Sequence, residues 1–109
     1  MWHETLYMSE HITEKEKTKI VNKINKEKNV KGILCLCLTN KKNFQLEILK
    51  VKDVIKEQDK ANIKIIGIAK DKEDAFNLTQ KIIEMIYNET KDVVIKKYFL
   101  YGEYDEKIS

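Results

Sequence analysis

The chain contains no arginine and no proline, and it has only three glycines and two cysteines among its 109 residues. All 21 basic residues are therefore lysine. The rigid fork of arginine is the usual device for bidentate recognition of guanine, phosphate or carboxylate, so its absence argues against sequence-specific reading of nucleic acid. An A/T-rich coding genome, which favours Lys, Ile and Asn codons together, explains the same absence. The missing arginine is thus only modest evidence about function.

Long apolar runs and targeting signals are also missing. The longest apolar run, Ile33 to Leu38, is far shorter than the ~18 residues that a membrane span requires. The first residues, Met1-Trp2-His3-Glu4, lack a basic region, and no apolar stretch of signal-peptide length follows them. These features predict a cytoplasmic protein with reduced thiols and no membrane partner.

Length and charge place the chain among ordinary globular domains. A hydrophobic fraction of 42% over 109 residues is enough to build one core without disulfides or metals. The net charge is only +3, and acidic and basic residues are interleaved, so attraction to polyanions is expected to be weak. We expect one α/β domain over residues 1–100 and a frayed tail over residues 101–109.

The clearest structural signal is a strand that leads directly into a helix. Residues 63–69 form a short run rich in β-branched residues. Its odd and even positions, which point to opposite faces of a strand, are both mostly apolar, as in a buried strand. Asp71 is placed as the N-cap of a helix over 72–88, and Glu73 and Asp74 complement its positive end. One face of that helix carries a mostly apolar set at helical spacing: Ala75, Leu78, Thr79, Ile82, Ile83 and Ile86.

The other elements follow from capping and alternation. Thr13 and Glu16 have the spacing of a capping box, which opens a lysine-rich helix over 13–28. Polar residues 40–43 have the length of a hairpin turn. Alternation over 44–49 predicts a strand, although a helix is the rival interpretation because Ile48, Val51 and Ile55 share a helical face. Further strands are predicted at 4–8, 33–39 and 92–100, and a short helix at 52–58.

This order predicts an α+β fold, an α/β two-layer sandwich. We expect a mixed sheet of four or five strands with the two main helices, 13–28 and 72–88, on one face. The order βαββ(α)βαβ resembles the split pattern of ferredoxin-like folds with one extra element. The resemblance concerns architecture alone and carries no function with it.

Cys35 and Cys37 are the first candidates for chemistry. On a strand they point the same way with Cα atoms about 6.5–7 Å apart, outside easy disulfide geometry. With His3 and His11 they would supply four metal ligands, but neither histidine has a zinc-type spacing from the cysteines. Core packing is the preferred interpretation, with metal binding and redox chemistry as the alternatives. His3 and His11 are otherwise expected to be exposed.

The turn at Ala69–Lys72 lies where α/β proteins bind ligands, and Gly67 nearby permits close backbone approach. An incoming phosphate would, however, meet the carboxylates of Asp71, Glu73 and Asp74, so a capped helix is preferred over an anion or nucleotide site. Acidic residues elsewhere are scattered among lysines as solvated helix faces. We therefore predict no catalytic, cofactor-binding or metal residue, and no enzymatic activity.

Three functions remain open. Strands 33–38 and 63–69 are apolar on both faces, and only the short helix or a second subunit is left to cover one of them, so we expect a self-associating, homodimeric interaction module. The alternative is a nucleic-acid-binding domain that uses the lysine-rich surface and the aromatic cluster Tyr98, Phe99, Tyr101 and Tyr104 beside Lys96 and Lys97. The third is a small-molecule-binding or catalytic domain.

Overall fold

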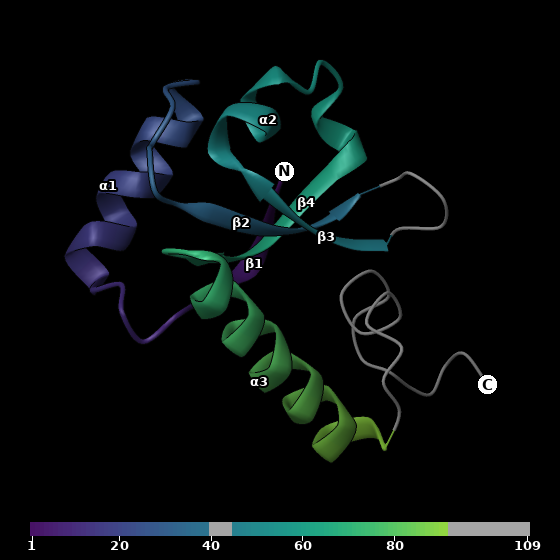
Figure 1. Cartoon of the computed structure of the whole chain (residues 1–109). Helices are drawn as coiled ribbons and strands as arrows, with labels where there is room; N and C mark the ends of the chain where they lie inside the picture. The colour runs from purple at the N-terminus through teal and green to yellow at the C-terminus, as the bar shows by residue number, and fades with distance from the viewer. Residues whose placement is uncertain (40–44, 92–109) are drawn as a thin grey trace.

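The computed structural model describes residues 1–39 and 45–91 (Figure 1). Its elements, in chain order, are β1 (Trp2–Met8), α1 (Glu14–Asn25), β2 (Leu34–Thr39), β3 (Gln45–Lys50), α2 (Val51–Lys56), a 3-10 turn at Lys60–Asn62, β4 (Ile63–Ala69) and α3 (Lys72–Thr90). The predicted turn at 40–43, the strand at 92–100 with its aromatic cluster, and the tail at 101–109 lie outside the described residues.

The four strands form one mixed sheet in the order β1-β4-β2-β3. β1 runs parallel to β4, whereas β2 is antiparallel to both β4 and β3. The predicted α+β class and mixed sheet are therefore confirmed. The ferredoxin-like order is not confirmed. Residues 45–50 pair with β2 over its whole length, from Leu34 opposite Lys50 to Thr39 opposite Gln45, so the strand prediction is right and the helical alternative is wrong.

The placement of the two main helices differs from the prediction, because they lie on opposite faces of the sheet. Cys35 and Cys37 of β2 pack with buried residues of α1 and α2. Leu36 and Leu38, which point the other way, pack with α3. In Figure 1, α2 lies above the sheet and α3 below it. Central strands that are apolar on both parities need a cover on each face, and dividing the helices between the faces provides both covers.

This arrangement removes the reason for expecting self-association through a sheet face. In β2, the side chains of Cys35, Leu36, Cys37 and Leu38 are at most 1% exposed within a single chain. Self-association is expected only if both long helices lie on one face of the sheet, which leaves the other face to the short helix or a second subunit. The chain covers both faces of β2 itself, so the burial of this strand needs no second subunit.

β4 departs from simple alternation at Ile66. Leu36 pairs with Gly67 and Cys37 with Ile65, so one residue of β4 is left over between two consecutive residues of β2. This is the arrangement of a β-bulge. A Cβ atom on Gly67 would lie 3.2 Å from Cδ2 of Leu78 and 3.3 Å from the carbonyl oxygen of Tyr7, so the position favours glycine.

The bulge changes which side chains share a face. Regular alternation predicts Gly67 on the face of Ile65, and Ile66 and Ile68 together on the opposite face. Instead, Ile68 packs with Ile65 in the core under α1 and α2. Ile66 packs under α3, and Gly67 faces Leu78 of the same helix. From Gly67 onward, the extra residue reverses the face of the sheet to which each side chain of β4 points.

Both predicted helix starts are confirmed. The Thr13 hydroxyl accepts a hydrogen bond from the Glu16 amide (3.1 Å), and the Glu16 carboxylate accepts one from the Thr13 amide (2.9 Å), which completes the capping box of α1. At α3, the Asp71 carboxylate accepts a hydrogen bond from the Asp74 amide (2.8 Å). The segments following β1 and β4 are therefore fixed where each enters its helix.

Replacing Asp71 by alanine is expected to lower the free energy of unfolding by about 1 kcal/mol, because α3 loses the acceptor at its first turn and a favourable charge at its positive end. Urea unfolding of the variant measures the loss. Asp71→Asn keeps an acceptor oxygen and is expected to retain most of the stability. Equal losses for the two variants would show that the cap contributes little and that charge alone matters.

Candidate functional site

The candidate site lies at the carboxyl ends of the neighbouring parallel strands β1 and β4. From there the chain continues from β1 to α1 on one face of the sheet, and from β4 to α3 on the other. In open sheets with parallel strands, ligands bind in the crevice at such a divergence. Two features occupy this region: a polar network centred on Asp74 and a cleft lined by lysines.

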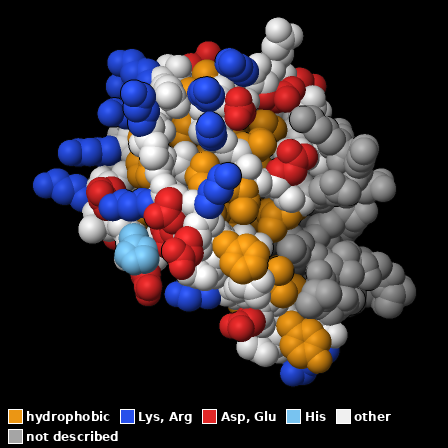
Figure 2. Space-filling model, viewed as in Figure 1, with side chains coloured by type: hydrophobic (Ala, Val, Ile, Leu, Met, Phe, Trp, Pro, Cys, Tyr) orange, Lys and Arg blue, Asp and Glu red, His pale blue; other side chains and the backbone are white. Residues whose placement is uncertain are grey.

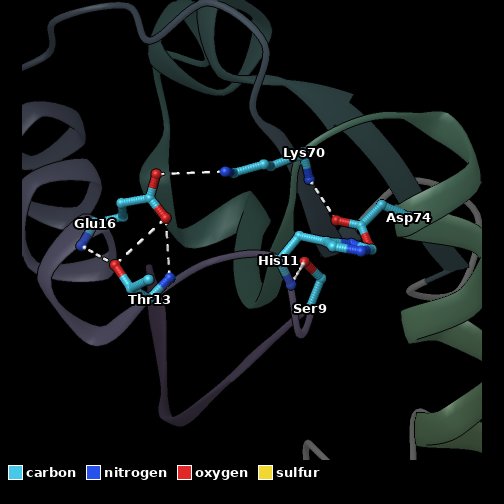
Figure 3. Close-up of polar contacts among 6 residues, drawn as sticks. All are labelled: Ser9, His11, Thr13, Glu16, Lys70 and Asp74. Carbon is cyan, nitrogen blue, oxygen red and sulfur yellow. Dashed lines mark hydrogen bonds and ion pairs between the residues drawn. The ribbon is translucent and has the colours of Figure 1, made fainter.

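Asp74, in the first turn of α3, connects the two loops (Figure 3). Its side chain is only 6% exposed. One carboxylate oxygen accepts a hydrogen bond from Nδ1 of His11 (2.8 Å), and the other accepts one from the Lys70 amide (2.9 Å). The Ser9 hydroxyl bonds to the same carboxylate and accepts a hydrogen bond from the His11 amide (3.2 Å). Asp74 thus holds the loop after β1 against the loop after β4.

The network shifts the pKa values of both partners. Burial acts to raise the pKa of Asp74, but hydrogen bonds from the Ser9 hydroxyl, the Lys70 amide and His11 outweigh it, so its pKa lies below the ordinary 3.8. The hydrogen bond and the charge of Asp74 raise the pKa of His11 above 6.5, with smaller contributions from Glu10 and Asp71. The protonated imidazole and the carboxylate therefore stabilise each other.

The pair predicts a pH dependence of stability. A raised pKa for His11 in the folded state gives stability that is complete below pH 6.5 and is lost as pH rises through the folded-state pKa. A lowered pKa for Asp74 gives stability that is present above pH 3.8 and is lost as pH falls through its folded-state pKa. The melting temperature is expected to fall as pH rises from 6.5, and His11→Gln is expected to flatten that decline. An unchanged decline in the variant would contradict the assignment.

Lys70 joins this network to the α1 side of the site. Its backbone amide reaches Asp74, and its ammonium lies 3.3 Å from a carboxylate oxygen of Glu16. Figure 3 shows Lys70 between the two acidic residues. The hydrogen bond from the Thr13 amide, followed by that from Lys70, lowers the pKa of Glu16. Glu16 therefore remains ionised and serves both the cap of α1 and Lys70.

Beside Lys70 the surface is hollowed in two adjoining places. The larger hollow, of about 520 Å³, lies between the segment before β2, the β3–α2 junction and the start of α3. The smaller, of about 400 Å³, lies between that segment and α1. They share Val30, Lys31, Gly32, Ile33 and Lys70. We call the two hollows together the lysine-lined cleft. Their size is typical of small-molecule sites.

The cleft has a strong positive charge. Of the described residues, seven lysines and two carboxylates line it, a local formal charge of +5, whereas the whole chain carries +3. The lysines are Lys19, Lys23, Lys31, Lys50, Lys52, Lys70 and Lys72, and the carboxylates are Glu16 and Asp71. Figure 2 shows lysine side chains gathered over the upper and left part of this face. Of the seven, only Lys70 has an ion-pair partner among the described residues.

The carboxylates at the start of α3, which argue against an anion site at the turn Ala69–Lys72, are mostly directed away from the cleft. Of the three acidic residues at the start of α3, only Asp71 lines the cleft. Asp74 points to His11 and Ser9, and Glu73 lines neither hollow.

Sequence reasoning missed the cleft because its lysines come from four separate segments and have no shared spacing. The contact between His11 and Asp74, 63 residues apart, had no sequence signal either.

The cysteine pair belongs to the core. Cys35 and Cys37 are free thiols with 0% exposure. A hydrogen bond between them, together with burial, raises the pKa of Cys37. His3 lies in β1, where its Nδ1 accepts a hydrogen bond from the Thr5 amide (3.1 Å). Within the described ranges, no three His, Cys, Asp or Glu side chains gather as metal ligands, so the cysteine–histidine set is not assembled there.

Both thiols are expected to react with a thiol reagent only as fast as the protein opens, because neither is accessible in the native state. Cys37→Ala is expected to lower the free energy of unfolding by about 1–2 kcal/mol through lost packing. Labelling kinetics in native buffer and urea unfolding test the two statements. Immediate labelling of either cysteine would contradict its burial.

No helix in residues 1–39 and 45–91 is long and apolar enough to cross a bilayer. Comparison of the chain with protein-family models, curated proteins and solved structures finds no match. The function therefore has to be argued from the site.

Proposed function

We propose that this protein is a binding domain for an anionic small molecule, which it holds in the lysine-lined cleft. The observation that carries the proposal is the charge of the cleft, +5 on a chain of +3, at the carboxyl end of β4. Like charges gathered at one place repel one another and favour the approach of an anion. A bound anion would relieve that repulsion.

The floor of the cleft supports a small ligand. The larger hollow is lined by Val30, Ile33, Leu34 and Val51 as well as by lysines, and apolar walls with a few charged groups are typical of small-molecule sites. Among residues 1–39 and 45–91, no aromatic side chain lines either hollow. Single-stranded nucleic acid is generally held by stacking its bases on aromatic rings, so the cleft is less suited to that ligand.

Titration calorimetry with tripolyphosphate as the probe tests the proposal. Wild-type protein is expected to bind it with an affinity that falls as salt rises. Lys31→Gln removes an exposed charge shared by both hollows and is expected to weaken binding roughly threefold to tenfold. Lys56→Gln, at an exposed position outside the cleft, is the matched control and is expected to change little. No binding by the wild type, or equal losses in both variants, would overturn the proposal.

A second candidate function is self-association, now through α3 instead of a sheet face. Phe76 and Tyr87 are 59% and 50% exposed. They are three turns apart in one helix and so lie on the same side of it. Figure 2 shows hydrophobic side chains exposed on the lower part of this face, over α3. Sedimentation of wild type and Phe76→Ser tests this proposal: a homodimer weakened by the substitution supports it, and a strict monomer overturns it.

We also propose a cytoplasmic location. The support is that Cys35 and Cys37 are free thiols, which persist in reducing compartments. Fractionation of cells that produce the protein checks the location, and recovery outside the cytoplasm would contradict it.

A further inference from the structure

We propose that the ligand of the lysine-lined cleft carries a chain of two or more phosphate groups, which spans both hollows and replaces Glu16 on Lys70. This inference rests on the proposed function and adds the chemical class of the ligand. It also names Glu16 as the protein's own occupant of the position that one phosphate would take.

The distribution of the lysines indicates more than one anionic group. Lys19 and Lys23 line only the smaller hollow, on the α1 side. Lys50 and Lys52 line only the larger hollow, at the β3–α2 junction. Lys70 lines both. A single phosphate in either hollow would leave the lysines particular to the other without a partner, whereas linked phosphates reach both sets. A phosphate chain is also the ligand for which lysine is a common point-charge partner.

Glu16 lines the smaller hollow and pairs there with Lys70, which lines both hollows. Its carboxylate lies 3.3 Å from the Lys70 ammonium, and the two side chains are 44% and 42% exposed. An ion pair so accessible to solvent contributes little to stability. A phosphate with several neighbouring lysines offers Lys70 a stronger interaction, so exchange of the carboxylate for the phosphate is favourable.

The exchange does not require α1 to unfold. Glu16 is held independently by the Thr13 amide (2.9 Å) within the capping box. If Lys70 leaves, the carboxylate keeps this hydrogen bond and remains at the start of the helix. The same geometry provides a clean variant, because glutamine serves at this position of a capping box as glutamate does. Glu16→Gln therefore removes the competing charge while the cap is kept.

Calorimetry with orthophosphate, pyrophosphate and tripolyphosphate tests the length of the chain. Affinity is expected to rise with each added phosphate. Lys23→Gln and Lys52→Gln, one from each hollow, are both expected to weaken tripolyphosphate binding. Tripolyphosphate binding as weak as that of orthophosphate, or dependent on only one of the two lysines, would overturn the spanning ligand while leaving the anion site intact. Tighter binding of a mixed single-stranded oligonucleotide through the same lysines would overturn the small-molecule assignment.

Glu16→Gln tests the competition. It is expected to tighten tripolyphosphate binding roughly threefold to tenfold, because the ligand no longer has to displace a carboxylate from Lys70. Glu14→Gln is the matched control: it makes the same charge change in the same turn of α1, at an exposed residue that lines neither hollow. Equal effects of the two variants would overturn the role of Glu16. Absence of any binding by the wild type would instead overturn the proposed function itself.

Discussion

Ile66→Ala is expected to lower the free energy of unfolding by about 3–4 kcal/mol, the largest effect we expect of a single substitution. The side chain of Ile66 is 0% exposed in the central strand β4 and packs in the core under α3. Removing three carbon atoms loses their burial and leaves a cavity that β4, hydrogen-bonded on both sides, cannot close. Urea unfolding measures the loss when the curves of wild type and variant are fitted with the same m value, the dependence of the free energy of unfolding on urea concentration.

The control for Ile66 is Ile48→Ala in the edge strand β3, where the isoleucine is 42% exposed. The same atoms are removed, but less apolar surface was buried and the side chain borders solvent, so a loss of about 1 kcal/mol is expected. Similar losses at the two positions would mean that Ile66 does not point into the core under α3.

Asp74→Ala is expected to lower the free energy of unfolding by about 3 kcal/mol. The substitution removes the acceptor for the Lys70 amide and for His11, and the partner of the Ser9 hydroxyl, while part of the network is shielded from water. Ser9 is only 6% exposed, so a hydroxyl left there without this partner costs about 1–3 kcal/mol, whereas the His11 side chain, 63% exposed, can bond to water instead. Thermal and urea unfolding at a pH below 6.5, where His11 is protonated, measure the effect at its greatest.

Glu73→Ala is the matched control for Asp74. Glu73 is also acidic and lies in the same first turn of α3, but it is exposed. Its removal costs only the interaction with the positive helix end, about 0.3–1 kcal/mol. If both variants lose the same stability, Asp74 acts through its charge at the helix end and not through the network. The pH dependence assigned to His11 should also disappear in Asp74→Ala and persist in Glu73→Ala.

Local sequence determined the type of most described elements and the starts of the two main helices, whereas α1 ends at Asn25 and not at the predicted residue 28. The strand at 63–69 and the helix starts at Thr13 and Asp71 were predictable because their signals act over a few residues: β-branched apolar runs, and side chains that reach amides of the following turn. The α+β class followed from the order of these elements. The alternation over 44–49 likewise predicted the strand that pairs with β2.

The tertiary structure alone decided how these elements combine. Apolar residues on both parities of 33–38 required two covers, but local pattern does not specify which helix takes which face, and both helices were wrongly placed on one. The bulge after Ile65 depends on pairing with β2, so parity in β4 could not be counted from the sequence alone. The contact of His11 with Asp74 and the lysine-lined cleft could not be predicted from the sequence alone either. The His11–Asp74 contact forms because β1 and β4 end side by side, and the cleft forms because the start of β2 lies between the ends of β4 and β3; both follow from the sheet order and not from any one segment.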